Sequence, residues 1–128
     1  MLKVGIYTEQ NCTISDCGDY GIYSAYGNTI ESITSCTISG CKYGIRNNYG
    51  NVGSITNCNI EKNKEYGLSG SDSKIQIDAQ NCWWGSTDGP GGIAPGSGDK
   101  IWGNINYEPW AKARIKDAGA KAVGGIGL

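Results

Sequence analysis

An internal repeat of about 23 residues runs through the middle of this chain and limits its fold more than any other feature. The pattern of residues 32–45 returns, with substitutions, in residues 54–68. Four sets of equivalent residues recur at this period. They are Cys12, Cys36, Cys58 and Cys82, with spacings of 24, 22 and 24; Tyr20, Tyr43 and Tyr66, with spacings of 23 and 23; Ile22, Ile45 and Leu68, with spacings of 23 and 23; and Ile33, Ile55 and Ile77, with spacings of 22 and 22. Because independent sets agree on one period, we interpret the pattern as a structural repeat.

A repeat of this length is compatible with three architectures: a leucine-rich repeat, a helical hairpin and one coil of a β-solenoid. Apolar and polar residues alternate within each repeat, as in residues 75–78, and this is the period of a strand with one buried face. Gly, Asn and Ser interrupt the strands, as at residues 47–51, and mark corners. Leucine is almost absent, which disfavours a leucine-rich repeat. We therefore predict a parallel β-helix in which each repeat is one rung of three short strands and three corners.

Equivalent residues of successive rungs are expected to stack about 4.8 Å apart and to form the core as inward-facing columns. Small and β-branched residues suit such a narrow core, and the chain contains no Phe. The predicted columns are Cys12, Cys36, Cys58 and Cys82; Ile14, Ile38, Ile60 and Trp84; Ile33, Ile55 and Ile77; and Ile22, Ile45 and Leu68. The predicted fold is thus all-β, a single-stranded β-solenoid of about four rungs.

Length, charge and hydropathy restrict the possible functions. At 128 residues the chain is expected to form one domain, and its net charge of −1 with scattered basic residues favours no nucleic-acid partner. No apolar run approaches the 18 residues of a membrane span. The first residues lack the apolar region and cleavage site of a signal peptide, so a secreted origin would require a leader before this numbering.

The six cysteines leave three possibilities open. Four residues separate Cys12 from Cys17 and Cys36 from Cys41, and the chain has no His to complete a mixed zinc site. We expect buried thiols that act as small hydrophobic groups, because stacked side chains suit disulfide torsions poorly. A disulfide between rungs or around a corner is the first alternative, and a metal or cluster site is the second. No cofactor is expected.

The first rung is predicted to be incomplete. Gly5-Ile6-Tyr7 matches Gly21-Ile22-Tyr23, but only sixteen residues separate the two glycines. An open rung exposes backbone groups and an apolar cross-section, which natural solenoids cover. Either the chain is a piece of a longer protein, or another molecule covers this end.

The sequence changes character in residues 81–110, where Asn81-Cys82-Trp83-Trp84-Gly85 precedes a Gly/Pro loop and then residues 103–110. Indoles can close a narrow core, and prolines stop strand pairing. These motifs and the rungs, over residues 10–110, resemble right-handed parallel β-helix proteins of the pectin-lyase-like superfamily, particularly repeat-bearing surface and secreted proteins of archaea and bacteria. The resemblance implies a right-handed helix, an extracellular or cell-surface location, and a closing segment. Its residues would be Trp83, Trp84, Pro90, Trp102, Tyr107, Pro109 and Trp110.

Three parts of the chain are therefore expected. Residues 1–80 would form the rungs, residues 81–110 the last rung and the closing segment, and residues 111–128 a short helix (111–122) and an apolar tail. The tail would be either a frayed terminus or a strand that pairs with another molecule.

The same superfamily includes polysaccharide lyases and glycoside hydrolases, so a remnant of such an enzyme is one alternative. Hydrolysis of a glycosidic bond needs two carboxylates that face it. In the predicted register Asp16 aligns with Gly40 and Lys62, while Glu61 aligns with Ser39. Since no acidic pair stacks and the chain has no His, we expect no catalytic site.

Our first expectation is a non-catalytic structural module that associates with other copies of itself through the first rung and the tail, as a filament or surface assembly. The alternative is a carbohydrate-binding module. Tyr26 and Tyr49 lie 23 residues apart, each before Gly-Asn, and could form an exposed aromatic step for a glycan. Asn47, Asn48 and Asn51 would then supply hydrogen bonds.

Overall fold

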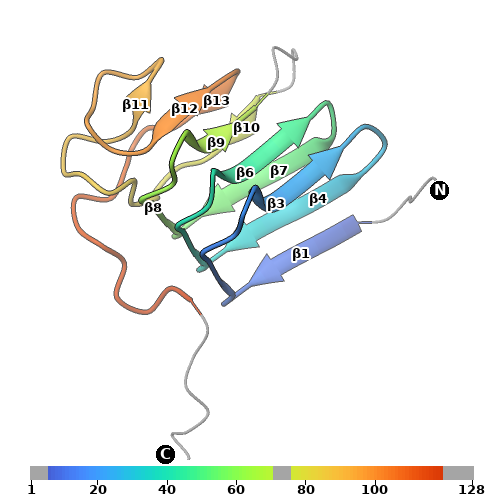
Figure 1. Cartoon of the computed structure of the whole chain (residues 1–128), viewed down its shortest axis with the longest axis horizontal. Helices are drawn as coiled ribbons and strands as arrows, with labels where there is room; N and C mark the ends of the chain where they lie inside the picture. The colour runs from blue at the N-terminus through green and yellow to red at the C-terminus, as the bar shows by residue number, and fades with distance from the viewer. Residues whose placement is uncertain (1–5, 71–75, 120–128) are drawn as a thin grey trace, which may run out of the picture.

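The computed structural model describes residues 6–70 and 76–119, and they form a parallel β-helix (Figure 1). Every strand pair is parallel, and the described residues contain no helix. The β1 sheet has the order β1 (Ile6–Gln10), β4 (Thr29–Thr34), β7 (Asn51–Thr56), β10 (Ile77–Asp78) and β13 (Ile105–Asn106). The β2 sheet consists of β2 (Thr13–Ser15), β5 (Thr37–Ser39) and β8 (Asn59–Glu61). The β3 sheet has the order β11 (Gly91–Gly92), β12 (Lys100–Trp102), β9 (Tyr66–Ser69), β6 (Tyr43–Asn48) and β3 (Tyr20–Ala25).

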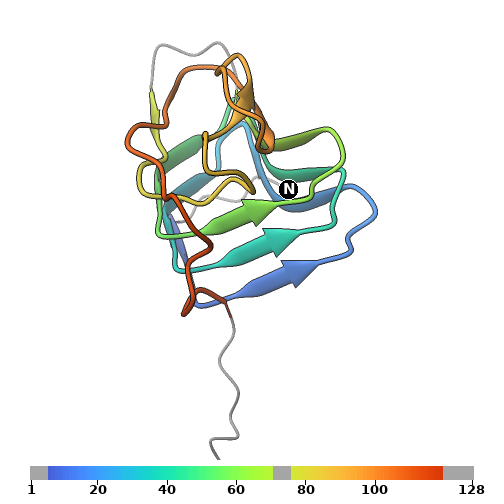
Figure 2. The same ribbon diagram turned by 90° about the vertical axis from the view of Figure 1, so that its left-hand side faces the viewer.

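Three complete rungs follow one another along the chain: β1–β3, β4–β6 and β7–β9. The prediction of an incomplete first rung is wrong, because Ile6 pairs with Thr29 at the start of β4 and is not equivalent to Ile22 on β3. A fourth rung is formed by β10, by Trp83, which bridges to Asn59, and by β12, which pairs with β9. The prediction of an all-β solenoid of about four rungs is confirmed. The stacking of the strands is visible in Figure 2.

Residues with positive φ make the chain turn at the same place in each rung. Asn11, Ser35, Asn57 and Asn81 have φ values of 55°, 55°, 53° and 60° and lie where the β1 sheet gives way to the β2 sheet. Asn tolerates this conformation better than other non-glycine residues. The recurring Asn/Ser of the repeat therefore has a backbone role as well as marking a loop.

The predicted core columns are largely present. Ile14 pairs with Ile38 and Ile38 with Ile60, while Ile22, Ile45 and Leu68 pair in succession. The column of Ile22, Ile45 and Leu68 continues to Ile101, since Ile101 pairs with Leu68. The thiols also stack: the Cys12 N–H donates to the Cys36 Sγ at 3.4 Å, and the Cys36 N–H to the Cys58 Sγ at 3.5 Å. Cys36, Cys58 and Cys82 are fully buried.

The predicted position of Ile77 beside Ile55 is wrong by two residues. Asp78 pairs with Ser54, so the position next to Ile55 belongs to Ala79, which is fully buried. Ile77 is also buried, but it pairs with Ile105 of the following rung. The chain between β7 and β10 is longer than the 22-residue spacing implied, and the side chains shift accordingly.

The closing segment fulfils its expected role only in part. Trp84 and Pro90 are fully buried, and Trp110 covers Gly89. A Cβ on Gly89, which has a φ of 88°, would lie 2.8 Å from the Trp110 indole, so there is no room for a side chain. Trp102 and Pro109, however, lie at the surface. Trp102 follows Ile101 on β12, and because side chains alternate along a strand, only one of them can face the core.

Residues 111–119 do not form the predicted helix. We call these nine residues the strap, because they run back along the outer face of the β2 sheet from the fourth rung toward the first (Figure 2). Asn59, which is fully buried, donates to the Ile115 carbonyl at 2.9 Å and accepts from its N–H at 2.7 Å. Thr37 donates to the Ala118 carbonyl at 3.1 Å. Partners on the rungs thus replace the internal hydrogen bonds of a helix, and tertiary contacts override the helix propensity of Ala.

Candidate functional site

The two ends of the solenoid differ in how well their apolar residues are covered. At the first rung, Cys12, Ile14, Cys17 and Ile22 are only partly buried. We call this surface the first-rung end. Their counterparts one rung later, namely Cys36, Ile38, Cys41 and Ile45, have no exposed surface. Within residues 6–70 and 76–119, no strand pairs with the outer edges of β1, β2 and β3.

The opposite end is covered by its own chain. Trp84 fills the core there, Pro90 is buried, and the Trp110 indole donates to the Thr87 carbonyl at 3.0 Å. The loop between Trp84 and β12 is held together by Asp88, which accepts from the Ser97 N–H and hydroxyl, both at 2.8 Å. We call this end the far end. The first-rung end is therefore the more open of the two.

The strap brings the C-terminal part of the chain to the first-rung end. The Gly119 N–H donates to the Ser35 carbonyl at 2.8 Å, and a Cβ on Gly119 would lie 2.8 Å from the Thr13 Oγ1 of the first rung. The predicted apolar tail, residues 120–128, lies outside the described residues. The described chain thus ends close to the open rung.

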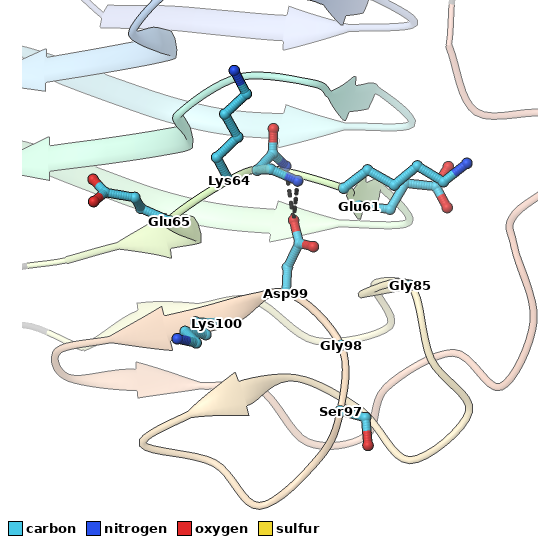
Figure 3. A pocket seen from close by; sticks show the side chains of 10 residues that line it. Glu61, Lys64, Glu65, Gly85, Ser97, Gly98, Asp99 and Lys100 are labelled. Atoms are coloured by element: carbon cyan, nitrogen blue, oxygen red, sulfur yellow. Dashed lines mark hydrogen bonds between the residues drawn. The ribbon is translucent and has the colours of Figure 1, made fainter.

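A second feature is a pocket of about 320 Å³ between the corner at residues 61–65 and the segment 97–100 (Figure 3). Asp99 forms part of its wall, and its Oδ2 accepts from the Asn63 N–H at 3.2 Å and from the Asn63 side-chain amide at 2.8 Å. Burial raises the pKa of Asp99 to about 6, although the hydrogen bonds from Asn63 act in the opposite direction.

The hydrogen bonds of Asp99 continue a series that links the rungs at this corner. The Cys41 N–H donates to the Asn63 Oδ1 at 3.0 Å, just as the Asn63 N–H donates to Asp99. In each case a side chain of the next rung satisfies a backbone donor at the corner. Asp99 is therefore explained as the last member of this series.

The other pocket carboxylates are also engaged in contacts. Glu61 accepts from the Trp83 indole at 3.0 Å and pairs with Arg114 at 2.8 Å, while Glu65 pairs with Lys42 at 3.7 Å. These contacts join neighbouring rungs and attach the strap. Among the residues that the structure describes, no cluster of three or more His, Cys, Asp or Glu is arranged to hold a metal ion.

A column of tyrosines lies on the outer face of the β3 sheet. The Tyr20 and Tyr43 ring centroids are 5.5 Å apart, and those of Tyr43 and Tyr66 are 5.9 Å apart with an interplanar angle of 18°. The Arg46 guanidinium lies 5.1 Å from the Tyr43 centroid. The Tyr43 ring faces are thus turned toward neighbouring rings and Arg46, and a sugar ring could not stack on them without displacing these groups. Their common period was recognisable in the sequence, but their contact was not.

The two tyrosines proposed as a glycan contact are both exposed, at 83% for Tyr26 and 55% for Tyr49. Their corners are not equivalent, however. Ala25 pairs with Asn48 and Thr29 with Asn51, so three residues connect the strands at the first corner and two at the second. Tyr49 itself has a φ of 60°, whereas at the first corner it is a glycine that has positive φ.

One of the three asparagines proposed beside these tyrosines is in the wrong place. Asn47 is buried, with 6% of its surface exposed, because it faces inward between β3 and β9. Asn48 donates to the Tyr23 hydroxyl at 3.0 Å, and Asn51 is exposed. Only Asn48 and Asn51 therefore remain available to a ligand at these corners.

Comparison with known proteins gives one match. A family model described as "right handed beta helix region" matches residues 7–84, which is more than half of the chain. Searches of curated proteins and of solved structures found no match. The matched region contains the three complete rungs except for Ile6, and it ends at Trp84. No described helix is long and apolar enough to cross a membrane.

Proposed function

Because the chain belongs to the right-handed β-helix family, we propose that it is a non-catalytic structural β-solenoid module of an extracellular or cell-surface protein, and that it associates with a second copy through its first rung. The observation that carries this proposal is the partial exposure of apolar residues at the first-rung end. The equivalent residues of the second rung are fully buried by stacking. A partner on the first rung would bury the exposed apolar surface in the same way.

The difference between the two ends favours a dimer over a filament. An open filament needs two different complementary surfaces on each copy, whereas an isologous dimer uses the same surface twice. The far end is covered by Trp84, Pro90 and Trp110, which hinders stacking of a further rung there. We therefore expect two first-rung ends to meet. The strap ends at Gly119, which donates to the Ser35 carbonyl close to this end of the solenoid.

The contacts of the pocket carboxylates within the protein support the non-catalytic role. Asp99, Glu61 and Glu65 each bind a neighbouring group of the protein. Their contacts explain their positions without a substrate.

Sedimentation velocity at several protein concentrations tests the association, with negative-stain microscopy to show particle shape. We expect a concentration-dependent dimer, and Ile14→Asp should weaken it, because the new carboxylate would lie at the contact. Asn51→Asp introduces the same charge at an exposed lateral corner and should leave dimerisation unchanged. Thermal unfolding of both variants shows whether the monomer stays folded. A wild-type protein that is monomeric at all concentrations would refute the association, and filaments would refute the dimer.

Carbohydrate binding is a second candidate, favoured by the exposure of Tyr26 and Tyr49. Calorimetric titration with soluble glycans would measure it. Changing both residues to Ala should abolish binding, whereas changing both to Phe should retain most of it, because the ring faces are kept. Unchanged binding by the folded Ala variant would remove these two residues from the site.

A further inference from the structure

Cys17 and Cys41 lie in the corners that join β2 to β3 and β5 to β6, with Cys17 partly exposed and Cys41 fully buried. Ser15 pairs with Ser39, and Cys17 and Cys41 each lie two residues further on. The intervening residues, Asp16 and Gly40, both have positive φ, at 55° and 73°. The two corners thus leave their strands in the same way, one rung apart, which corresponds to about 4.8 Å; beyond the cysteines the first corner has one residue more before Tyr20 pairs with Tyr43. This separation is within the Cα range that a disulfide requires, roughly 4.4–6.8 Å.

Backbone contacts hold the two corners side by side. The Asp16 N–H donates to the Ser39 carbonyl at 3.0 Å, immediately before the two cysteines. Burial, together with the neighbouring Cys17, raises the pKa of the Cys41 thiol to about 11. Cys41 is fully buried and Cys17 is partly exposed, so a reagent would meet Cys17 first.

The position of this pair on the first rung allows the movement that a disulfide needs. Stacked side chains must approach from the rung spacing to a Cβ separation of about 3.8 Å and adopt a torsion near 90°. In the central rungs, neighbours on both sides oppose such a shift. Cys17 has only one neighbouring rung within the described residues, and no atom outside its chain neighbours lies within 4 Å of a Cβ built on Gly18.

The other thiol column also has a partly buried member on the first rung, Cys12, but its thiols are held by shorter hydrogen bonds, since Cys12 donates to the Gln10 carbonyl at 3.4 Å. Cys36, Cys58 and Cys82 are fully buried, and Cys36 donates to the Thr34 carbonyl at 3.3 Å. The corresponding contact of Cys17, to the Ser15 carbonyl, is longer at 4.0 Å.

We propose that Cys17 and Cys41 form an oxidation site, at which a small organic disulfide converts the two thiols into a disulfide between the first and second rungs. The Cys17 thiolate attacks one sulfur of the reagent, a mixed disulfide forms at Cys17, and the first thiolate of the reagent leaves. The Cys41 thiolate then attacks the Cys17 sulfur, and the second thiolate leaves. Both cysteines lose a proton and are oxidised, and the reagent is reduced to two thiols. The product fixes the first rung to the second.

The test uses the full chain at a concentration at which it is monomeric, treated with cystamine at mildly alkaline pH. Cystamine is a cationic disulfide, which suits a corner that carries Asp16 and Asp19. We expect the intact mass to fall by two hydrogens, and peptide mapping should locate the bond between residues 17 and 41. Hydrogen exchange of the β2 amides should slow after oxidation, because the first rung is restrained.

Two variants make the outcome decisive. Cys41→Ser should stop the reaction at the mixed disulfide on Cys17, whereas Cys12→Ser should leave the bond between Cys17 and Cys41 unaffected. A stable cystamine adduct in the wild-type protein would overturn the proposal, as would a disulfide between Cys12 and Cys36. Since the reaction takes place within a monomer, its outcome is independent of dimerisation.

Discussion

At the scale of the residue, Asp99 is notable because its carboxyl is buried beside Asn63. Its pKa in the folded protein is about 6, above the ordinary value of 3.8. The stabilisation that accompanies its protonation is fully present below about pH 4 and is lost as the pH rises through 6. Ionised Asp99 therefore lowers the stability of the fold at neutral pH.

We predict that Asp99→Asn removes this pH dependence. The amide oxygen can still accept from Asn63, but it carries no charge to desolvate. Between pH 4 and pH 7.5 the wild type should lose roughly 1–3 kcal/mol of unfolding free energy relative to the variant, measured by urea unfolding. Parallel curves for the two proteins would contradict the prediction.

The pKa of a second carboxyl, that of Asp88, is shifted in the opposite direction to that of Asp99. Hydrogen bonds from Ser86 and Ser97 lower the pKa of this exposed carboxyl to about 2. Its stabilising effect is present above about pH 4 and is lost as the pH falls toward 2. It acts in a lower pH window and in the opposite direction, and it is present in both proteins, so it cancels from the comparison with Asp99→Asn.

At the scale of the element, the strap shows how a segment without strand or helix can be fixed. At one register position, successive rungs carry Thr13, Thr37 and Asn59, and the last two bind the strap backbone. Asn59 supplies both a donor and an acceptor to the peptide groups of Ile115. The strap is therefore held mainly through its backbone, with the Arg114–Glu61 pair as a side-chain contact.

We predict that Asn59→Ala releases the strap. The substitution leaves the Ile115 N–H and carbonyl without their partners and should cost roughly 1–3 kcal/mol of unfolding free energy. Hydrogen exchange at the Ile115 amide should become faster, while the β5 amides should keep their protection.

Arg114→Gln provides the matched control for this prediction. It removes only an ion pair whose arginine is 53% exposed, so the loss should be at most about 1 kcal/mol. If both variants changed exchange at Ile115 equally, the ion pair would hold the strap as strongly as Asn59, which would contradict the prediction.

The strap and the fourth rung mark the limit of what the repeat could predict. The columns of the first three rungs were predicted from their period, because each rung repeats the same contacts. Ile101 was missed because the loop after Trp84 places it 33 residues after Leu68, so the period fails although the stacking continues. The roles of Asp99 and Asn59 had no periodic signal, because Asp99 lies in a loop, and Asn59 contacts a strap, that each occur only once in the chain.

At the scale of the whole molecule, stability should vary along the solenoid axis. Each rung of a solenoid contacts only its neighbours, so a rung with one neighbour is less stable than one with two. The amides on both sides of β5 have partners: the Thr37 N–H donates to the Cys12 carbonyl, and the Asn59 N–H to the Cys36 carbonyl. No described strand lies beyond the outer edge of β2.

We therefore predict a gradient of hydrogen exchange in the β2 sheet. In the monomer, the amides of β2 should exchange at least about tenfold faster than those of β5 and β8, because the first rung can open without disturbing the others. Raising the protein concentration should slow exchange in β2 alone if first-rung ends associate. Exchange mass spectrometry at two concentrations separates three results. Uniform protection in the monomer would refute the gradient, and a gradient that is unaffected by concentration would refute association through the first rung. A gradient that disappears when the protein concentration is raised would support both the gradient in the monomer and association through the first rung.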